Sequence, residues 1–228
     1  MLHAHEFWIA GEPATFATKR EQPWKETIRQ ALPEGESCCQ RGGMLLDFQV
    51  QSSQRGGQLF DVDNMCEPIF SAVINQLGWL GGRRPNLLWF RARRSLRTPS
   101  GCTVRLEQGS APEFKPDGYR LVFKDVYTGP LPKSGTAPEL PAWLAELPGV
   151  RSGTDRGVSI RLSFAGTNVN LGDIATGAVK STIDCLYPLL GGTASAPDDW
   201  KVNVLQCEKG AADAPAEGLL IEVWSGEA

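Results

Sequence analysis

Two aspartates stand two residues apart in the sequence Asp61-Val62-Asp63-Asn64. On an extended backbone, residues i and i+2 point to the same side, so both carboxylates can reach one ligand. Mg²⁺ prefers oxygen ligands and usually takes one or two carboxylates together with water and phosphate. Such an ion polarises a phosphodiester and supplies a hydroxide nucleophile. The motif therefore predicts half of a phosphodiesterase site, although the same residues are also typical of an ordinary turn and helix cap.

A helix is expected to follow this motif directly. Asn64 is a favoured N-cap, and Glu67 three residues later completes a pair that resembles a capping box. Pro68 would lie in the first turn, where a missing N–H is tolerated, and Gly78 would end the helix. We therefore expect a helix that begins after Asn64 and carries the aspartate pair at its N-terminus.

The chain also resembles itself. The segment 60–77 matches the segment 169–186 at an offset of 109 residues, and both run on into Leu-Gly-Gly. Each half reads as a strand, a short helix with a Trp, a second strand, a main helix and two further strands. In the second half we expect Asp173 to cap the main helix. Matches in the same order predict a duplication.

The sequence thus predicts an α+β fold made of two tandem units that form a pseudo-two-fold dimer within one chain. The first unit covers residues 1–107 and the second covers residues 119–228. The stretch 108–118, which is rich in Pro, Gly, Ser and Lys, is expected to be the linker between them.

The residues resemble the RusA family of Holliday-junction resolvases. Asp61-Val62-Asp63-Asn64 before a helix is similar to the family's Asp-Leu-Asp-Asn motif, and Gly11-Glu12-Pro13 resembles its N-terminal Gly-x-Pro. The second half is similar to the later part of the pattern, a helix with Lys and Asp and then an Asp-Asp-x-x-Val strand. The segments that match there are Lys180, Asp184-Cys185-Leu186 and Asp198-Asp199-Trp200-Lys201-Val202. The resemblance implies a homodimer-like body, Mg²⁺ as cofactor and branched DNA as substrate.

Neither half holds the family's complete set of three acids. The first half has Asp61 and Asp63 but reads Pro-Asn-Leu where the third acid belongs. The second half has Asp198 and Asp199, but Asn170 and Gly172 replace the first two, and Asp173 would substitute only in part. Either the sites have decayed or acids from both halves meet in one composite site. The sequence favours decay, because a composite site needs both edges within a few ångströms of one ion.

The resemblance nevertheless assigns roles to four aspartates. The predicted catalytic residues are Asp61, Asp63 and Asp199. The predicted Mg²⁺ ligands are Asp61, Asp63, Asp198 and Asp199.

Basic residues are concentrated in the later part of the first half. No acidic residue occurs from 68 to 106, and Trp79, Trp89 and Phe90 lie among the arginines. Arginine suits bidentate contact with phosphate, and aromatic rings stack on unpaired bases. The predicted nucleic-acid-binding residues are Arg83, Arg84, Arg91, Arg93, Arg94 and Arg97. A solvated strand face or an acidic protein partner would also account for them.

Three functional hypotheses follow. The first is a DNA-binding protein, for branched or single-stranded DNA, with impaired catalysis. The second is an active Mg²⁺-dependent endodeoxyribonuclease that cuts branched DNA. The third is a subunit of a nucleoprotein complex, recruited through the second half, where thirteen acids face nine Lys and Arg from residue 118 onward.

Composition limits the remaining classes. The net charge of −3 argues against a uniformly basic coat for nucleic acid. No apolar run is long enough to span a bilayer, and residues 1–10 lack the features of a signal peptide. We therefore expect no membrane association and a cytoplasmic protein.

Overall fold

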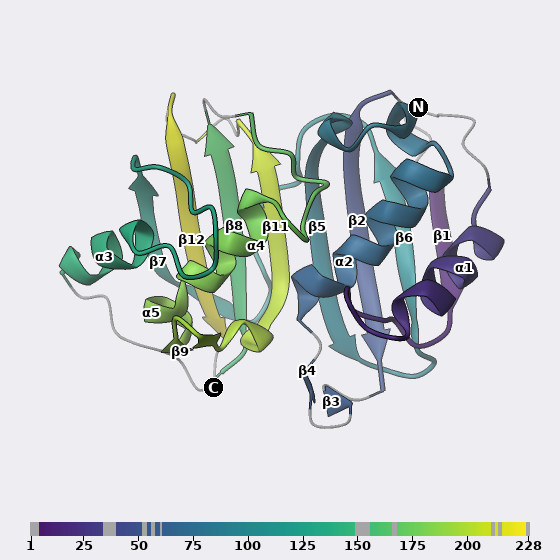
Figure 1. Cartoon of the computed structure of the whole chain (residues 1–228), viewed down its shortest axis with the longest axis horizontal. Coiled ribbons are helices and arrows are strands. Elements are labelled where there is room, and N and C mark those ends of the chain that lie inside the picture. The colour runs from purple at the N-terminus through teal and green to yellow at the C-terminus, as the bar shows by residue number, and fades with distance from the viewer. Residues whose placement is uncertain are drawn as a thin grey trace.

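A computed structural model describes residues 5–33, 40–51, 54–55, 58–59, 61–148, 156–165, 168–210, 213 and 216–226. Within them, the chain is a mixed α+β protein built on one large sheet, with its helices packed on one face (Figure 1). The first half contains β1 (His5–Ala10), α1 (Glu21–Ala31), β2 (Gly42–Val50), β3 (Gln54–Arg55), β4 (Gln58–Leu59), α2 (Val62–Phe70), β5 (Leu87–Leu96) and β6 (Gly101–Glu107). The second half contains β7 (Tyr119–Tyr127), α3 (Glu139–Glu146), β8 (Val158–Ala165), α4 (Ala178–Cys185), α5 (Tyr187–Leu190), β9 (Gly192–Thr193), β10 (Ala196–Pro197), β11 (Val202–Lys209) and β12 (Gly218–Gly226).

The eight long strands run in the order β1-β6-β2-β5-β11-β8-β12-β7. β5 and β11 pair antiparallel at the centre, whereas β2 with β5 and β8 with β11 pair parallel. Outward from the central pair, the first half runs β5, β2, β6, β1 and the second half runs β11, β8, β12, β7. In each half the third long strand along the chain is central and the first strand is at the edge. The order of main elements expected for each half is confirmed, including the Trp-containing helices α1 and α3.

The central pair is in symmetric register. Arg91 faces Gln206, and on either side Phe90 faces Cys207 and Ala92 faces Leu205. The Arg91 Nε donates a hydrogen bond of 2.7 Å to the Gln206 Oε1. The elements themselves correspond at spacings near 116 residues: β2 begins at Gly42 and β8 at Val158. The offset of 109 predicted from the helix segments therefore does not relate the two halves.

The main helix of the first half begins earlier than the sequence predicted. Asp61 is the N-cap, in extended conformation, and α2 starts at Val62 rather than after Asn64. Pro68 then lies inside the helix, where it has no N–H to donate to the Asn64 carbonyl. That carbonyl instead accepts a hydrogen bond of 2.9 Å from the backbone N–H of Phe16. A loop contact thus makes the internal proline tolerable.

The main helix of the second half also begins elsewhere than expected. α4 starts at Ala178 with Gly177 as its N-cap, so Asp173 is not the cap. The Asp173 carboxylate instead accepts hydrogen bonds from the backbone N–H and the hydroxyl of Thr176. These bonds close the turn that precedes the helix. No helix in the described part of the chain is both long enough and apolar enough to cross a membrane.

The core lies between the helices and the sheet face that they cover. Along β2 every second side chain is buried, including Met44, Leu46 and Phe48. Phe70 of α2 meets Phe90 of β5 edge to face, with ring centroids 5.1 Å apart. This packing fixes α2 over β5, beside the central strand pair.

The connection 108–118 packs against the sheet on the face that the helices leave uncovered. The Trp89 indole N–H donates to the Gly109 carbonyl at 2.8 Å, and Arg91 donates to the Pro112 carbonyl at 2.9 Å. The Trp89 ring lies over Gly43 of β2, where a Cβ would be only 1.9 Å from the ring. The absence of a side chain at Gly43 is therefore what admits the ring.

Gly43→Ala is expected to lower the free energy of unfolding by about 1–3 kcal/mol, because the added methyl forces the Trp89 ring or β2 to shift. Urea denaturation followed by tryptophan fluorescence measures this loss. Thr103→Ala, a half-buried change on the adjacent strand, is the control and should stay within about 0.5 kcal/mol of the parent. Equal midpoints for Gly43→Ala and the parent would contradict the packing described.

Candidate functional site

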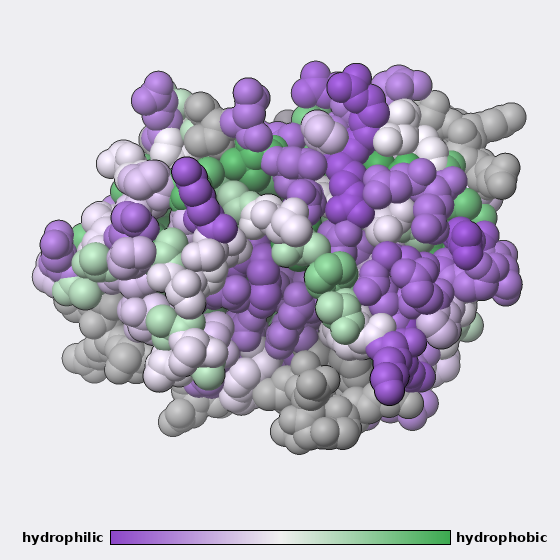
Figure 2. All heavy atoms as spheres, viewed as in Figure 1, coloured by the Kyte–Doolittle hydropathy of each residue, from purple (hydrophilic) through white to green (hydrophobic). Residues whose placement is uncertain are grey.

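Side chains from both halves converge beside the central strand pair. Asp61 and Asp63 come from the N-terminus of α2, Lys180 and Asp184 lie one turn apart on α4, and Asp199 opens a 3₁₀ turn before β11. The Lys180 Nζ lies 3.2 Å from the Asp63 Oδ2, 2.9 Å from the Asp184 Oδ1 and 2.6 Å from the Asp199 Oδ2. We refer to these five residues as the carboxylate–lysine cluster. Hydrophilic side chains gather in the middle of this molecular face, between α2 and α4 (Figure 2).

Burial and mutual repulsion perturb the acids of the cluster. Burial, with the charges of Asp199 and Asp63, raises the pKa of Asp61 to about 7. Burial also raises the pKa of Asp63, whose residue is only 3% exposed, against the opposing effect of Lys180. Burial raises the pKa of Asp184 to about 6. At neutral pH the centre is therefore poised between holding protons and holding another cation.

The ammonium group responds in the opposite sense. Burial alone would lower the pKa of Lys180, but the charges of Asp63, Asp199 and Asp184 outweigh it and raise that pKa. Lys180 therefore stays charged and orients the carboxylates around it. The Asn64 Nδ2 adds a hydrogen bond of 2.9 Å to the Asp61 Oδ2.

The donor set of the cluster suits a hard divalent cation. Three carboxylates contact the ammonium of Lys180, and the fourth, Asp61, also interacts with the charge of Arg94. Four acids against these two cations leave negative charge in excess. The Asp63 Oδ2 and Asp184 Oδ1 are buried and accept no hydrogen bond from the described residues, although Lys180 lies within ion-pair distance of both. Oxygen donors of this kind favour Mg²⁺.

The point on which the carboxylates converge is taken by the ammonium of Lys180. Among the described residues, no group of three or more His, Cys, Asp or Glu side chains is arranged as metal ligands. A bound cation would have to share Asp63 and Asp199 with Lys180, and Asp61 would be its third ligand.

Of the two adjacent aspartates predicted as ligands, only one belongs to the cluster. Asp199 contacts Lys180, whereas Asp198 forms an ion pair of 2.8 Å with Lys201 and accepts a hydrogen bond from the Trp200 indole. From the sequence, both were predicted as ligands and Asp199 alone as catalytic. The close approach of the two halves that a composite site requires is present, because the β5–β11 pairing places α2 beside the turn that precedes β11. Decay of the sites stays a prediction.

Two members of the cluster were not predicted as site residues. Lys180 and Asp184 were named only among the residues that resemble the RusA pattern, and neither was given a role. Their spacing of four residues, which places both on one helix face, was a usable signal. What the spacing could not reveal is that this face points to the acids of the other half.

The six predicted nucleic-acid-binding arginines do not form one surface. Arg84 is held inside the protein by Glu67, and Arg94 donates to the Trp200 carbonyl and the Asn203 Oδ1. Arg83 and Arg97 are exposed but stand beyond opposite ends of the ten-residue strand β5. At about 3.3 Å per residue, the length of the strand separates them by roughly 30 Å.

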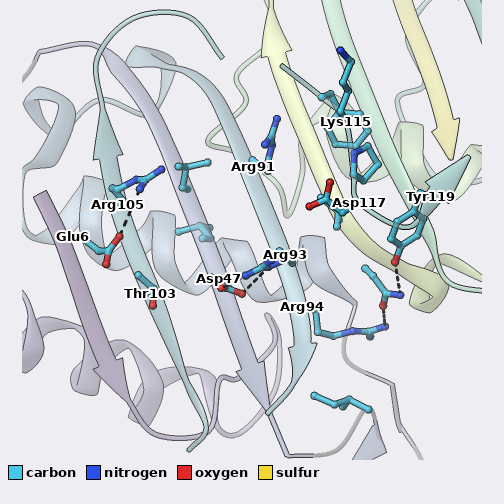
Figure 3. A pocket seen from close by; sticks show the side chains of 17 residues that line it. Glu6, Asp47, Arg91, Arg93, Arg94, Thr103, Arg105, Lys115, Asp117 and Tyr119 are labelled. Atoms are coloured by element: carbon cyan, nitrogen blue, oxygen red, sulfur yellow. Dashed lines mark hydrogen bonds and ion pairs between the residues drawn. The ribbon is translucent and has the colours of Figure 1, made fainter. Parts of the chain in front are cut away.

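Arg91 and Arg93 point to the uncovered sheet face, where the structure has a cavity of about 770 Å³ (Figure 3). The segment 108–118 forms one wall, with Phe114 against the sheet. The cationic side chains that line the cavity are Arg91, Arg93, Arg94, Arg105 and Lys115. The anionic side chains are Glu6, Asp47 and Asp117. The cavity is therefore more cationic than anionic, although Arg93 is bonded to Asp47.

The fold and the cluster together define an α+β protein with an acidic centre shared between two halves of similar topology. Compared with known proteins, the chain matches no protein-family model and no curated protein. A relation to the RusA family therefore rests on residues and geometry and is a proposal.

Replacing Asp61 is expected to change how stability depends on pH. The pKa of Asp61 lies above its ordinary value of 3.8, so the folded chain holds this proton more tightly than the unfolded chain. The resulting stabilisation is complete below pH 4 and is lost as the pH rises to about 7, at roughly 1 kcal/mol per pH unit.

Asp61→Asn keeps a capping side chain but removes this titration. Thermal melts between pH 4.5 and 8 should show a shallower loss of stability for the variant than for the parent. Parallel curves would contradict the buried, proton-holding carboxyl. Asp198→Asn is the control, and its curve should follow that of the parent.

Proposed function

We propose that the protein is a RusA-like phosphodiesterase that cuts branched DNA at the carboxylate–lysine cluster. The observation that carries the proposal is the meeting of Asp61 and Asp63 from one half with Asp199 from the other, around Lys180. The sequence alone favoured impaired catalysis because no half is complete. The convergence in space supports the alternative of an active enzyme.

Each residue of the cluster has a role that follows from its surroundings. Asp61, Asp63 and Asp199 would hold Mg²⁺, which when bound polarises a phosphodiester and lowers the pKa of a coordinated water. Lys180 positions Asp63 and Asp199 by contacting both.

A purely structural ion-pair network explains the cluster less well. On the other sheet face, Arg161 and Lys124 bind Glu208, Glu222 and Asp213, so that two cations meet three anions. The cluster has four carboxylates for two cations, Lys180 and the neighbouring Arg94, and uncompensated buried charge is costly. Strongly perturbed acids gathered with a lysine are typical of functional sites. The hypothesis of a complex subunit assumes that the acids of the second half are available to a partner. Glu208, Asp213 and Glu222 are instead paired with Arg161.

The two neighbouring aspartates at the start of β11 provide a matched test. Asp199→Asn should reduce Mg²⁺-dependent cleavage of a four-way DNA junction by at least about a hundredfold, because a ligand carboxylate contributes several kcal/mol. Asp198→Asn, one residue away and bonded to Lys201, should keep activity within about threefold.

The readout is product formation on denaturing gels with and without Mg²⁺. Cleavage that survives in Asp199→Asn, or that needs no divalent cation, would remove the cluster from the reaction. A parent protein that cuts no DNA would overturn the proposal.

A second candidate is binding of nucleic acid without cleavage, as the sequence first suggested. It is favoured by the cationic cavity on the uncovered sheet face, where Asn203 links the half-buried ring of Tyr119 to Arg94 (Figure 3). Guanidinium groups beside aromatic rings suit a single strand, whose bases stack and whose phosphates pair with cations. The position of Lys180 at the centre of the cluster also suits a protein that binds no metal.

Lys115→Ala should lower the slope of log affinity against log salt for single-stranded DNA by about 0.7, because one phosphate contact is lost. Lys133→Ala removes another exposed lysine, outside the cavity, and should leave the slope unchanged. Fluorescence anisotropy at several salt concentrations measures both. Identical slopes for the two variants would place nucleic acid outside the cavity.

A further inference from the structure

The place that corresponds to the cluster in the first half of the chain carries inverted charges. Arg84 and Asp199 each open a 3₁₀ turn three residues before a central strand, before Leu87 of β5 and Val202 of β11. Each also pairs with a residue of the preceding main helix. Asp199 pairs with Lys180 of α4, and Arg84 pairs with Glu67 of α2. The acid–base pair is thus present on both sides of the central strand pair, in opposite orientation.

All three side-chain nitrogens of Arg84 and both carboxylate oxygens of Glu67 form hydrogen bonds. Arg84 binds both Glu67 oxygens, at 2.7 and 3.0 Å, and its Nε donates to the Asn75 Oδ1. The remaining contacts come from the second half. Arg84 also donates to the Gly172 carbonyl at 2.8 Å, and the Ile174 N–H donates to Glu67 at 3.2 Å. One guanidinium balances one carboxylate, so this place has no excess charge to attract a cation.

The segment around Gly172 also has no room for an acid. A Cβ at Gly172 would lie 2.9 Å from the Arg84 Cβ and 3.1 Å from its carbonyl oxygen. At the spacing of about 116 residues, the counterparts of Asp61 and Asp63 are Gly177, the N-cap of α4, and Val179, and neither carries a carboxylate. The second centre is closed by packing as well as by charge.

We infer that the protein has a single competent centre and nicks one strand of branched DNA instead of cutting two strands in a paired event. This inference rests on the proposed phosphodiesterase function. In each turnover the oxygen of water forms a bond to phosphorus, and the bond from phosphorus to one sugar oxygen breaks. The water proton passes to a carboxylate, and the leaving oxygen takes a proton from solvent. A paired cut needs this reaction at two centres, and the Arg84–Glu67 pair occupies the second.

A supercoiled plasmid with an extruded cruciform distinguishes one incision from two. In Mg²⁺, nicked circles should exceed linear product at least tenfold when half of the plasmid has reacted. Asp63→Asn should slow nicking by at least about a hundredfold. Asn75→Ala, which alters only the closed place, should leave the rate and the ratio unchanged.

Mn²⁺ binding gives a readout that does not depend on cleavage. Titration at pH 8, followed by electron paramagnetic resonance of free Mn²⁺, should give one bound ion per chain for the parent and for Asn75→Ala. Asp63→Asn should bind none at the same concentrations.

The outcomes separate the two proposals. Linear product formed without a nicked intermediate, or two Mn²⁺ ions per chain, would overturn the single-centre inference and leave the phosphodiesterase proposal in place. A protein that binds one Mn²⁺ and cuts neither form overturns nicking and the proposed enzyme together. Absence of both binding and cutting overturns the cluster as a metal centre.

Discussion

The antiparallel pairing of β5 with β11 is the constraint on which the rest of the structure depends. It continues one sheet across both halves of the chain, in a register symmetric about Arg91 and Gln206. Because each main helix packs over its own half of the sheet, this pairing also sets α2 beside the turn that leads into β11. The carboxylate–lysine cluster exists only through that juxtaposition, since Lys180 comes from the second half and Asp63 from the first.

Much of the architecture could be predicted from local patterns. Apolar residues at every second position marked β2 and β8, and turn residues separated the strands in the right order. The helix starts were predicted less well, because capping preferences compete with tertiary contacts. Asn64 has the properties of a cap, but Asp61 takes that role while the Asn64 carbonyl bonds to the Phe16 N–H. No local pattern in the sequence contains that contact.

The candidate site was predictable only as fragments. The spacing of Asp61 and Asp63 suggested a shared ligand, but their partner Asp199 lies more than a hundred residues away and is brought near by strand pairing. Asp198 and Asp199 are equivalent in sequence and differ only in the direction of their side chains within one turn. The arginines show the same limit, since strand alternation sends Arg93 to the uncovered face and Arg94 toward the acids.

Both halves belong to one polypeptide, and this has a genetic consequence. In a dimer of identical subunits, any codon change alters both copies of a centre, so loss in one is loss in the other. Here each half is encoded separately. The charges at Glu67 and Arg84 can therefore differ from those at Lys180 and Asp199. Covalent linkage thus permits specialisation that symmetry would forbid.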